Sequence, residues 1–509
     1  MGRGQRAVVL GGSIAGMCAA GAVAPYFDEV AVLERDVIGE DTEHRRGVPQ
    51  SKHPHFLLNS GRRALDRIYP GFEEALIDAG ALHMMPSQAA AHCEGAGWIP
   101  RGESTMSMIY SSRLLIERTL RDQMSRVDNI HLEEGVSILD LEGTEPGPDG
   151  RISGVWVTDG APGSRRLIEA ELVIDALGRG SGVSQWLAHA GWPQVPVQSL
   201  DAGVTYSSRW YQKPAELPAD WWWAQMSVMP TSDTGPHPAE HDFLCQIFPI
   251  ENDRVLVTMG SWGHAMPRTE EDFVATTKKV RAPAFGRAVA QCEPLTKVFV
   301  TKSTGNIRRR YDQLDPVPGG LVSIGDAVCG FNPFYAQGMS SAGKSAVLLG
   351  EKLAEASSLD SGFVADYYTA QRRLLDDIWT LALARDQGYA NAEGTEIAPR
   401  WRQKIAYRAS WPIFNHISAT SRENAAVEQH FTAVFNLDES VTDMVKSPRV
   451  LAGLAWHGIK RALHRTRLPM GFDARQDPPS AIWRDGKPYP GGRAQVLPRG
   501  VNPNVTAQS

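Results

Sequence analysis

The sequence predicts an α/β fold: a Rossmann-like domain in two pieces, an antiparallel sheet inserted between them, and a helical region toward the C-terminus. Three observations lead to this prediction. A glycine-rich turn follows a short apolar run near the N-terminus, and a second turn, Gly325-Asp326, follows another apolar run more than 300 residues later. Between them lie segments with the alternating polar and apolar pattern of an antiparallel sheet.

The order of these patterns sets the expected domain boundaries. We expect the Rossmann-like domain to comprise residues 5–190 and 306–355, and the inserted sheet to comprise residues 191–305. Residues 356–468 are predicted to be helical. Residues 469–509 are rich in proline and glycine, which predicts a tail that meanders over the surface or is disordered.

Composition excludes several classes of function. The net charge of −6 is modest and no long basic run occurs, so nucleic acid is not an expected partner. The 5 cysteines are scattered without a C-x-x-C pair, which indicates neither a disulfide framework nor a zinc site and fits a reducing cytoplasm. The apolar N-terminal run superficially resembles a signal peptide, but its glycines favour a strand–turn–helix unit.

The first turn, Gly11-x-Ser13-x-x-Gly16, has the spacing of a dinucleotide-binding loop. Gly11 permits the tight turn, Gly16 permits close helix–strand packing, and the helix N-terminus offers free N–H groups to a pyrophosphate. Glu34 ends the second predicted strand, 23 residues after Gly11, and is expected to hold a ribose hydroxyl. Arg35 is placed to approach the adenine or the phosphate.

Arg113 begins a predicted amphipathic helix over residues 112–127. A cation is unfavourable at a helix N-terminus unless an anion lies there. A pyrophosphate or a flavin edge would supply that anion; the alternative is a solvated arginine.

The second turn predicts the other half of a flavin site. Asp326 is expected to accept hydrogen bonds from ribityl hydroxyls, and the helix that begins at Gly338-Met339 is expected to face the N1/O2 edge of the flavin. Pro333, Phe334 and Gln337 are the candidates for the face of the ring. The alternative is a strand–loop–helix connection without a ligand.

Two other features have competing interpretations. His53-Pro54-His55 is more typical of a loop near the flavin than of a metal site, because no cysteine, third histidine or suitably spaced acid accompanies it, and no metal is expected. The aromatic residues of the inserted sheet form either ordinary core or, in part, the wall of an apolar pocket. These residues are Tyr206, Trp210, Tyr211, Trp221, Trp222, Trp223, Phe243, Phe248 and Trp262.

These motifs, in this order, resemble the FAD-dependent monooxygenases built like 4-hydroxybenzoate hydroxylase and squalene epoxidase. Within them, the sequence is most similar to bacterial flavin epoxidases of polyether and terpenoid biosynthesis. The resemblance spans about residues 5–390. The residues that carry it are Arg46-Gly47-Val48-Pro49-Gln50, His53, His55, Leu57-Leu58, Ser112-Arg113-x-Leu115, Gly178-Arg179-Gly180-Ser181, Gly325-Asp326-Ala327 and Phe331-Asn332-Pro333.

The resemblance implies a reaction as well as a fold. Reduced FAD reacts with O₂, and a C4a-hydroperoxyflavin passes one oxygen atom to an apolar polyketide or terpenoid, by epoxidation or hydroxylation in specialised metabolism. No catalytic residue is assigned, because the flavin supplies the reactive oxygen. The resemblance also extends the expected cofactor contacts to Gly12, Ile14, Ala15, Arg46, Gln50, Val136 and Gly178.

Departures from the family pattern leave the electron donor open. Leu177 and Ser184 stand where many relatives carry an aspartate and an arginine linked to nicotinamide use. NADPH or NADH is therefore expected to act either directly or through a separate flavin reductase. Ala336 stands at a position that is often glycine.

Other functions fit the same motifs. A flavin-dependent prenyl double-bond reductase, like the geranylgeranyl reductases, would work without oxygen. A flavin halogenase would carry a Trp-x-Trp-x-Ile-Pro motif, which Trp221-Trp222-Trp223-Ala224 does not match, and a non-enzymatic flavin-binding regulator would not be reduced by any donor. The basic stretch 446–467, with apolar residues at helical spacing, predicts either packing against the first domain or a weak membrane-surface contact.

Overall fold

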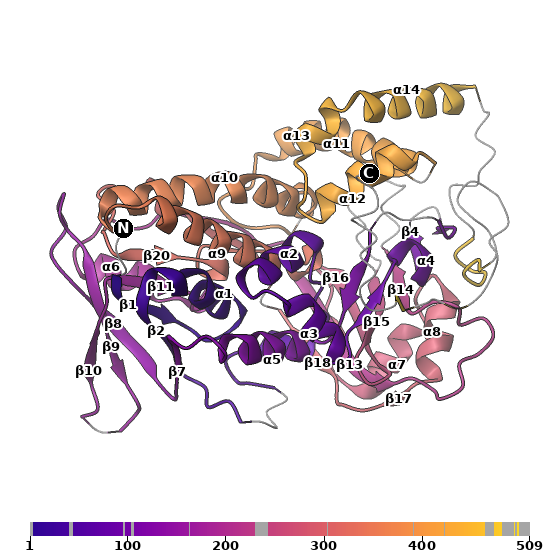
Figure 1. Ribbon diagram of the computed structural model, residues 1–509. Helices are drawn as coiled ribbons and strands as arrows, with labels where there is room; N and C mark the ends of the chain where they lie inside the picture. Colours follow the sequence, from indigo (N-terminus) through magenta and orange to yellow (C-terminus); the bar gives the residue numbers. More distant parts are fainter. Residues whose placement is uncertain are drawn as a thin grey trace.

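The computed structural model describes residues 4–39, 44–94, 97–102, 106–161, 163–229, 243–302, 304–389, 391–421, 423–463, 473–480, 493 and 496–497. The predicted α/β fold is confirmed, with a parallel sheet, a large antiparallel sheet and a helical C-terminal region (Figure 1). All 5 cysteines are buried, and none of them forms a disulfide. In the described part of the chain, no helix has the length and apolar character needed to cross a membrane.

A five-stranded parallel sheet forms the base of the Rossmann-like domain. Its strands are short apolar runs, as expected for strands that are covered on both faces. In spatial order they are β20 (Leu321–Ser323), β11 (Leu172–Asp175), β1 (Gly4–Leu10), β2 (Phe27–Glu34) and β7 (Ile130–Glu134). Helices α1 (Ile14–Val23) and α9 (Gly338–Glu355) pack against each other and bring the two glycine turns together.

The larger sheet is mostly antiparallel. Its main path runs β17 (Glu293–Pro294), β13 (Val204–Gln212), β16 (Arg254–Trp262), β15 (Leu244–Ile250), β14 (Gln225–Val228), β4 (Ala90–Glu94) and β5 (Gly97–Trp98), and β18 (Phe299–Thr301) also pairs with β13. Strands β4 and β5 lie in the range that the sequence assigned to the Rossmann-like domain, yet β4 pairs with β14 in parallel. The part of the chain that precedes α5 (Arg113–Met124) therefore contributes two strands, β4 and β5, to the larger sheet.

Smaller elements complete the two domains. The sheets are β10 (Arg166–Glu169), β9 (Ile152–Thr158) and β8 (Ser137–Gly143); β12 (Val197–Leu200), β19 (Asn306–Arg309) and β21 (Cys329–Gly330); and β3 (Leu82–Met84) with β6 (Met108–Tyr110). The helices are α2 (Asn59–Ile68), α3 (Phe72–Asp78), α4 (Pro86–Ala89), α6 (Val183–His189), α7 (Glu270–Thr277) and α8 (Pro283–Ala290).

A glycine and a proline mark two boundaries between elements. Gly135 takes a φ of +73° and separates β7 from β8, which belong to different sheets. Helix α7 ends at Thr277, and Pro283 is the first residue of α8, a position that proline tolerates because the N–H there has no helical partner.

The C-terminal region is helical, as predicted. Helix α10 (Ser361–Asp386) runs along α9, and the remaining helices lie together at the top of Figure 1. These are α11 (Arg400–Ser421), α12 (Ala425–Phe435), α13 (Val441–Lys446) and α14 (Pro448–Ala462).

Part of the predicted tail is held on the inserted sheet. The backbone carbonyls of Gln476 and Pro478 accept hydrogen bonds from the indoles of Trp98 (3.0 Å) and Trp222 (3.1 Å). Most of the remaining tail lies outside the described residues.

The contact between α1 and β1 generates a stability prediction. A Cβ added at Gly16 would lie 1.7 Å from the carbonyl oxygen of Gly11. Overpacking against backbone costs about 3 kcal/mol or more when neither atom can yield, so Gly16→Ala should lower the free energy of unfolding by that amount in urea titrations. Gly147→Ala is the matched control, since nothing lies within 4 Å of its added Cβ. Equal stability of the two variants would contradict the packing account.

Candidate functional site

The turn between β1 and α1 presents free backbone donors. Gly11 takes a φ of +102°, and an added Cβ there would meet the Ala176 carbonyl at 2.9 Å, so this turn requires glycine. Ser13 is the N-cap residue of α1, but its side chain makes no capping hydrogen bond. Its hydroxyl instead accepts a hydrogen bond from Nη2 of Arg113 at 2.9 Å. The N-terminal amides of Ile14 and Ala15 therefore remain available to an anion.

Arg113 is the first residue of α5 and is buried beside this turn. Ser112 caps the helix by accepting the Leu115 amide at 3.1 Å, and Glu251 accepts the Ser112 hydroxyl at 2.7 Å. Burial lowers the pKa of Arg113 to about 10, with Asp326 opposing the change and Arg45 adding to it. The guanidinium is therefore still charged at neutral pH, and it adds a second positive centre next to the N-terminus of α1.

Two buried glutamates, Glu34 and Glu117, and a buried arginine, Arg45, lie on one side of the turn. Glu34 accepts the Gly12 amide at 3.0 Å and lies 3.1 Å from Nη1 of Arg45. The other terminal nitrogen of Arg45 contacts Glu117 on α5. Sequence reasoning missed both Arg45 and Glu117: the two arginines at 45 and 46 are adjacent, and the pattern alone does not say which side chain turns inward.

The other residues that the sequence assigned to this region are spread around it. Val136 is buried and donates its amide to the Glu34 carbonyl at 2.9 Å. The side chain of Arg35 is 64% exposed, and Arg46 and Gln50 are also exposed. These three residues reach a dinucleotide only from the solvent side, and their role as cofactor contacts stays a prediction.

The second glycine turn places an acid at the start of α9. Gly325 takes a φ of +62°, and its added Cβ would lie 2.8 Å from that of Ala15, so the turn packs directly on α1. The carboxylate of Asp326 lies 3.4 Å from Nε of Arg179. Its Oδ1 is also 3.5 Å from a Cβ built on Gly338, the first residue of α9.

The backbone around Asp326 is held from behind. Arg309 donates hydrogen bonds to the carbonyls of Ala327 (3.0 Å) and Arg179 (2.8 Å). Gly178, before Arg179, has a φ of +75° with open space around its Cα. These contacts join the segment Gly178-Arg179 to the second glycine turn.

The loop from Asn332 to Gln337 leads into α9. Ala336 takes the left-handed conformation, with a φ of 56° and a ψ of 24°, which explains why glycine would be common there. Pro333 is exposed, Phe334 is half-buried, and Gln337 is buried with no hydrogen-bond partner for its Oε1 among the described residues. Met339 is buried in the first turn of α9.

The aromatic residues of the inserted sheet separate into groups. Trp262 packs edge-on against Phe334, with ring centroids 5.0 Å apart, and stacks on Tyr389 at 5.4 Å. Tyr206 belongs to the same cluster. The other buried aromatics of the sheet lie in separate core clusters: Tyr211, Trp221, Trp222 and Trp223 in one, and Trp210 and Phe248 in another. Among the described aromatic residues of the sheet, only the cluster of Tyr206, Trp262, Tyr389 and Phe334, here called the Trp262 group, adjoins the candidate ring face.

The two predicted loop histidines lie next to the inserted sheet, with Arg113 near enough to His55 to affect its pKa. Nδ1 of His53 lies 2.7 Å from the Ser208 hydroxyl, and Nδ1 of His55 lies 2.9 Å from the His53 carbonyl. Burial, with Lys52 nearby, lowers the pKa of His53 to about 4; burial, with Arg113 nearby, lowers the pKa of His55 to about 3. Both imidazoles are therefore neutral at neutral pH.

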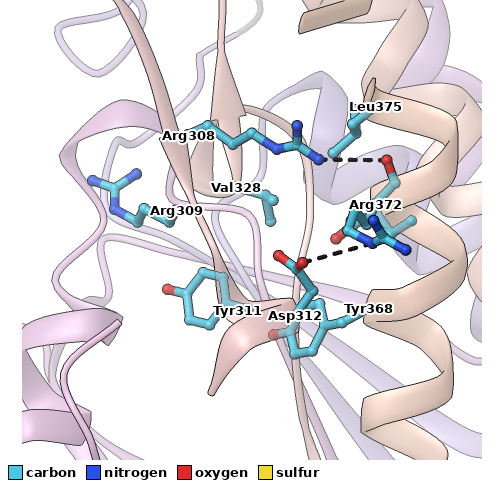
Figure 2. A pocket seen from close by; sticks show the side chains of 9 residues that line it. Arg308, Arg309, Tyr311, Asp312, Val328, Tyr368, Arg372 and Leu375 are labelled. Carbon is cyan, nitrogen blue, oxygen red and sulfur yellow. Dashed lines mark hydrogen bonds and ion pairs between the residues drawn. The ribbon is translucent and has the colours of Figure 1, made fainter. Parts of the chain in front are cut away.

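A small cavity of about 10 Å³, room for one water molecule, lies between β19 and α10 (Figure 2). Arg308 turns from β19 toward α10, where its guanidinium pairs with Asp376 at 2.8 Å, and Arg372 on α10 lies 3.7 Å from Asp312. Both arginines are paired with carboxylates of the chain itself. These ion pairs join α10 to the Rossmann-like domain, and the cavity between them is not the ligand site.

Comparison with known proteins finds a relative in sequence. No protein-family model matches the chain. The protein Rv3254 of Mycobacterium tuberculosis (strain ATCC 25618 / H37Rv) is 28% identical over 474 residues, which cover 91% of this chain and 96% of that protein.

Solved structures show which fold this is. The flavin-dependent brominase Bmp2 superposes with a TM-score of 0.60 at 14% identity, over 90% of this chain and 99% of that one. The p-nitrophenol 4-monooxygenase PnpA of Pseudomonas putida DLL-E4 gives 0.59 at 12% identity, over 86% and 99%. A variant of HpxO from Klebsiella pneumoniae, complexed with FAD, gives 0.53 at 15% identity, over 80% and 94%.

The chain shares its fold with these flavin-dependent enzymes. The residues at the two glycine turns fit a dinucleotide flavin: an uncapped helix N-terminus and a buried arginine for the pyrophosphate, an acid at either end, and a second helix N-terminus for the ring.

The histidine environment predicts a pH dependence of stability. Both folded pKa values lie below the value of about 6.5 for an unfolded histidine. Between about pH 6.5 and pH 4 the unfolded chain therefore binds more protons, and stability should fall as the pH is lowered through this window. His53→Gln and His55→Gln should each flatten the loss, measured by urea unfolding at pH 7 and pH 5. His189→Gln, on exposed α6, is the control; an unchanged slope in both loop variants would contradict the account.

Proposed function

We propose that this chain is an FAD-dependent monooxygenase that transfers one oxygen atom of O₂ to an apolar polyketide or terpenoid, by epoxidation or hydroxylation. One observation carries the proposal: the N-terminus of α1, the buried Arg113 guanidinium and the Asp326 carboxylate converge where the two glycine turns meet. When bound and reduced, FAD supplies the activated oxygen.

Each part of the chain has a binding role in this proposal. The free amides at the start of α1, together with Arg113, hold the pyrophosphate. Glu34 accepts a ribose hydroxyl in place of its bond to the Gly12 amide, and Asp326 accepts ribityl hydroxyls. The N-terminus of α9 faces the ring edge that gains negative charge on reduction.

The Trp262 group supports the proposal that the substrate which receives the oxygen atom is apolar. Phe334 is the half-buried member of that group nearest to the start of α9, and Trp262, Tyr206 and Tyr389 extend from it into the inserted sheet. Such a wall binds an apolar substrate through buried area and keeps water away from the reacting oxygen. His53 and His55 are neutral, so these two side chains place no charge beside the inserted sheet.

A flavin halogenase is the second candidate, favoured by the structural similarity to the brominase Bmp2. A flavin-dependent prenyl reductase is the third. The electron donor, NADPH or NADH directly or through a flavin reductase, and a cytoplasmic location remain predictions of the same proposal.

The proposal predicts a specific order of events in rapid mixing. FAD-loaded protein should be reduced anaerobically by NADPH, by NADH or, if neither acts, by dithionite. On mixing with oxygenated buffer, a transient species with blue-shifted flavin absorbance should precede reoxidation, with no need for halide. A slow reoxidation without any transient would favour the reductase. Acceptor chlorination or bromination that depends on added halide would favour the halogenase.

The outer face of α14 supports a weak contact with an anionic membrane surface. Val450 and Leu454 pack inward, but Leu451, Trp456 and Ile459 are more than half exposed on the opposite side. Neither α14 nor α11 carries an acidic residue, and the basic residues on these helices are Arg400, Arg402, Lys404, Arg408, Arg449, Lys460 and Arg461. An apolar outer stripe with basic flanks fits an interfacial helix.

Sedimentation with vesicles of anionic phospholipid tests this contact. The wild-type protein should pellet at low salt and be released at high salt, because the basic flanks are screened. Trp456→Ser combined with Ile459→Ser should lower the pelleted fraction several-fold. Val37→Ser removes an apolar side chain that is 72% exposed on the Rossmann-like domain, and it is the control. Wild-type protein that stays in the supernatant at low salt would exclude the contact.

A further inference from the structure

The C-terminal end of α10 carries a buried carboxylate that the cofactor cradle does not explain. Asp386 is the last residue of α10 and is 1% exposed. A negative charge is unfavourable there twice over, because burial removes its hydration and the C-terminal end of a helix is itself negative. Burial raises the pKa of Asp386, and the hydrogen bonds that it accepts oppose that change.

Four side-chain donors surround this carboxylate. Oδ1 accepts the Trp262 indole N–H at 3.0 Å and the Tyr335 hydroxyl at 3.1 Å. Oδ2 accepts the side-chain amides of Asn306 at 2.8 Å and Asn332 at 3.0 Å. The donors come from β16, β19 and both ends of the loop segment 332–335, so one side chain links three separate segments of the fold to α10.

Asn332 transmits this anchoring to the loop backbone. Its Oδ1 accepts hydrogen bonds from the Phe334 backbone amide at 3.1 Å and the Tyr206 hydroxyl at 3.2 Å. The backbone amide of Asn332 donates to Oδ1 of Asn306 at 2.8 Å. The loop then passes through the left-handed Ala336 into α9. A left-handed alanine costs about 1 kcal/mol relative to glycine and persists where its surroundings impose it.

We propose that Asp386 is a positioning residue that fixes the segment from Asn332 to Ala336, and with it the Phe334 ring, against the flavin-binding start of α9. The proposal rests on the proposed function for the flavin and on the hydrogen-bond network for the loop. It also gives the Trp262 group its orientation, since the Trp262 indole is held at its nitrogen by Asp386 and packs on Phe334 with its ring.

The chemistry requires a carboxylate at this position. Four donors need four acceptor lone pairs, which an ionised carboxylate has. An asparagine at 386 keeps one acceptor oxygen and turns an NH₂ group toward two donors, so those two donors lose their partners. Tyr335→Phe is milder, because it removes one donor and leaves the buried carboxylate with three.

The test uses the full-length protein with and without FAD. Asp386→Asn should raise hydrogen exchange in residues 331–337 of the apoprotein at least tenfold, with the parallel sheet unchanged. In the same variant the FAD dissociation constant should rise about tenfold, and the visible spectrum of bound FAD should shift. Asp377→Asn, at an exposed position of the same helix, is the matched control and should change none of these quantities.

The readouts separate the ways in which the proposal can fail. Unchanged exchange in residues 331–337 of Asp386→Asn would overturn the positioning of the loop. Increased exchange with an unchanged FAD dissociation constant and spectrum would reduce Asp386 to a structural role and overturn its link to the flavin. If Asp386→Asn does not fold, Tyr335→Phe decides: it should show the same changes at smaller size, and a wild-type result in both readouts overturns the proposal. If the wild-type protein binds no FAD, the proposed function is overturned. Hydrogen exchange in residues 331–337 of the apoprotein would still test whether Asp386 positions the loop.

Discussion

One electrostatic constraint organises the site: a charged arginine is buried beside the uncapped N-terminus of a helix. Arg113 and the first amides of α1 place positive charge at one point of the interior, and Ser13 is the hydroxyl between them. The carboxylates around this point have cationic partners of their own, because Glu34 and Glu117 pair with Arg45 and Asp326 pairs with Arg179. The free amides of α1 and the Arg113 guanidinium can therefore donate to a bound anion, which is why the residues fit the pyrophosphate of a dinucleotide better than a neutral ligand.

The fold serves this constraint by joining distant parts of the chain. The parallel sheet sets β1 beside β11 and β11 beside β20, so the two glycine turns emerge at the same edge. Close packing then determines how near they come: Gly16 touches the Gly11 carbonyl and Gly325 touches Ala15. The inserted sheet approaches from the other side, where Ser112 binds Glu251 and His53 binds Ser208. Asp386 supplies the corresponding anchor for the ring-side loop.

The sequence predicted the parts of the fold that depend on local patterns. The glycine turns, the acid at Glu34 and the helix start at Gly338 follow from spacing that local backbone geometry requires, and each lies where it was expected. Ala336 takes a positive φ at a position that is often glycine in the family that the sequence resembles. At Gly135 the chain passes from β7, which pairs with the distant β2, to β8, which pairs with the next strand β9, and the local sequence pattern does not show this change of sheet.

The direction of individual side chains and the hydrogen bonds between distant segments could not be predicted from sequence patterns. Arg45 rather than its neighbour Arg46 turns to Glu34, and no periodicity distinguishes two adjacent arginines in a loop. Asp386 ends an amphipathic helix like any polar residue, and its role is visible only when Trp262, Asn306 and Asn332 are brought to it from elsewhere in the chain. The parallel pairing of β4 with β14 is equally non-local.

The central claim, that the two glycine turns bind a dinucleotide flavin, is tested most directly by calorimetric titration of the apoprotein with FAD and with FMN. The adenosine and the second phosphate of FAD are the groups that Arg113, the start of α1 and Glu34 would hold. The account predicts one equivalent of FAD bound, with a dissociation constant at least about 100-fold below that of FMN, equivalent to about 2.7 kcal/mol. Equal affinities for the two flavins, or no binding of FAD, would contradict it.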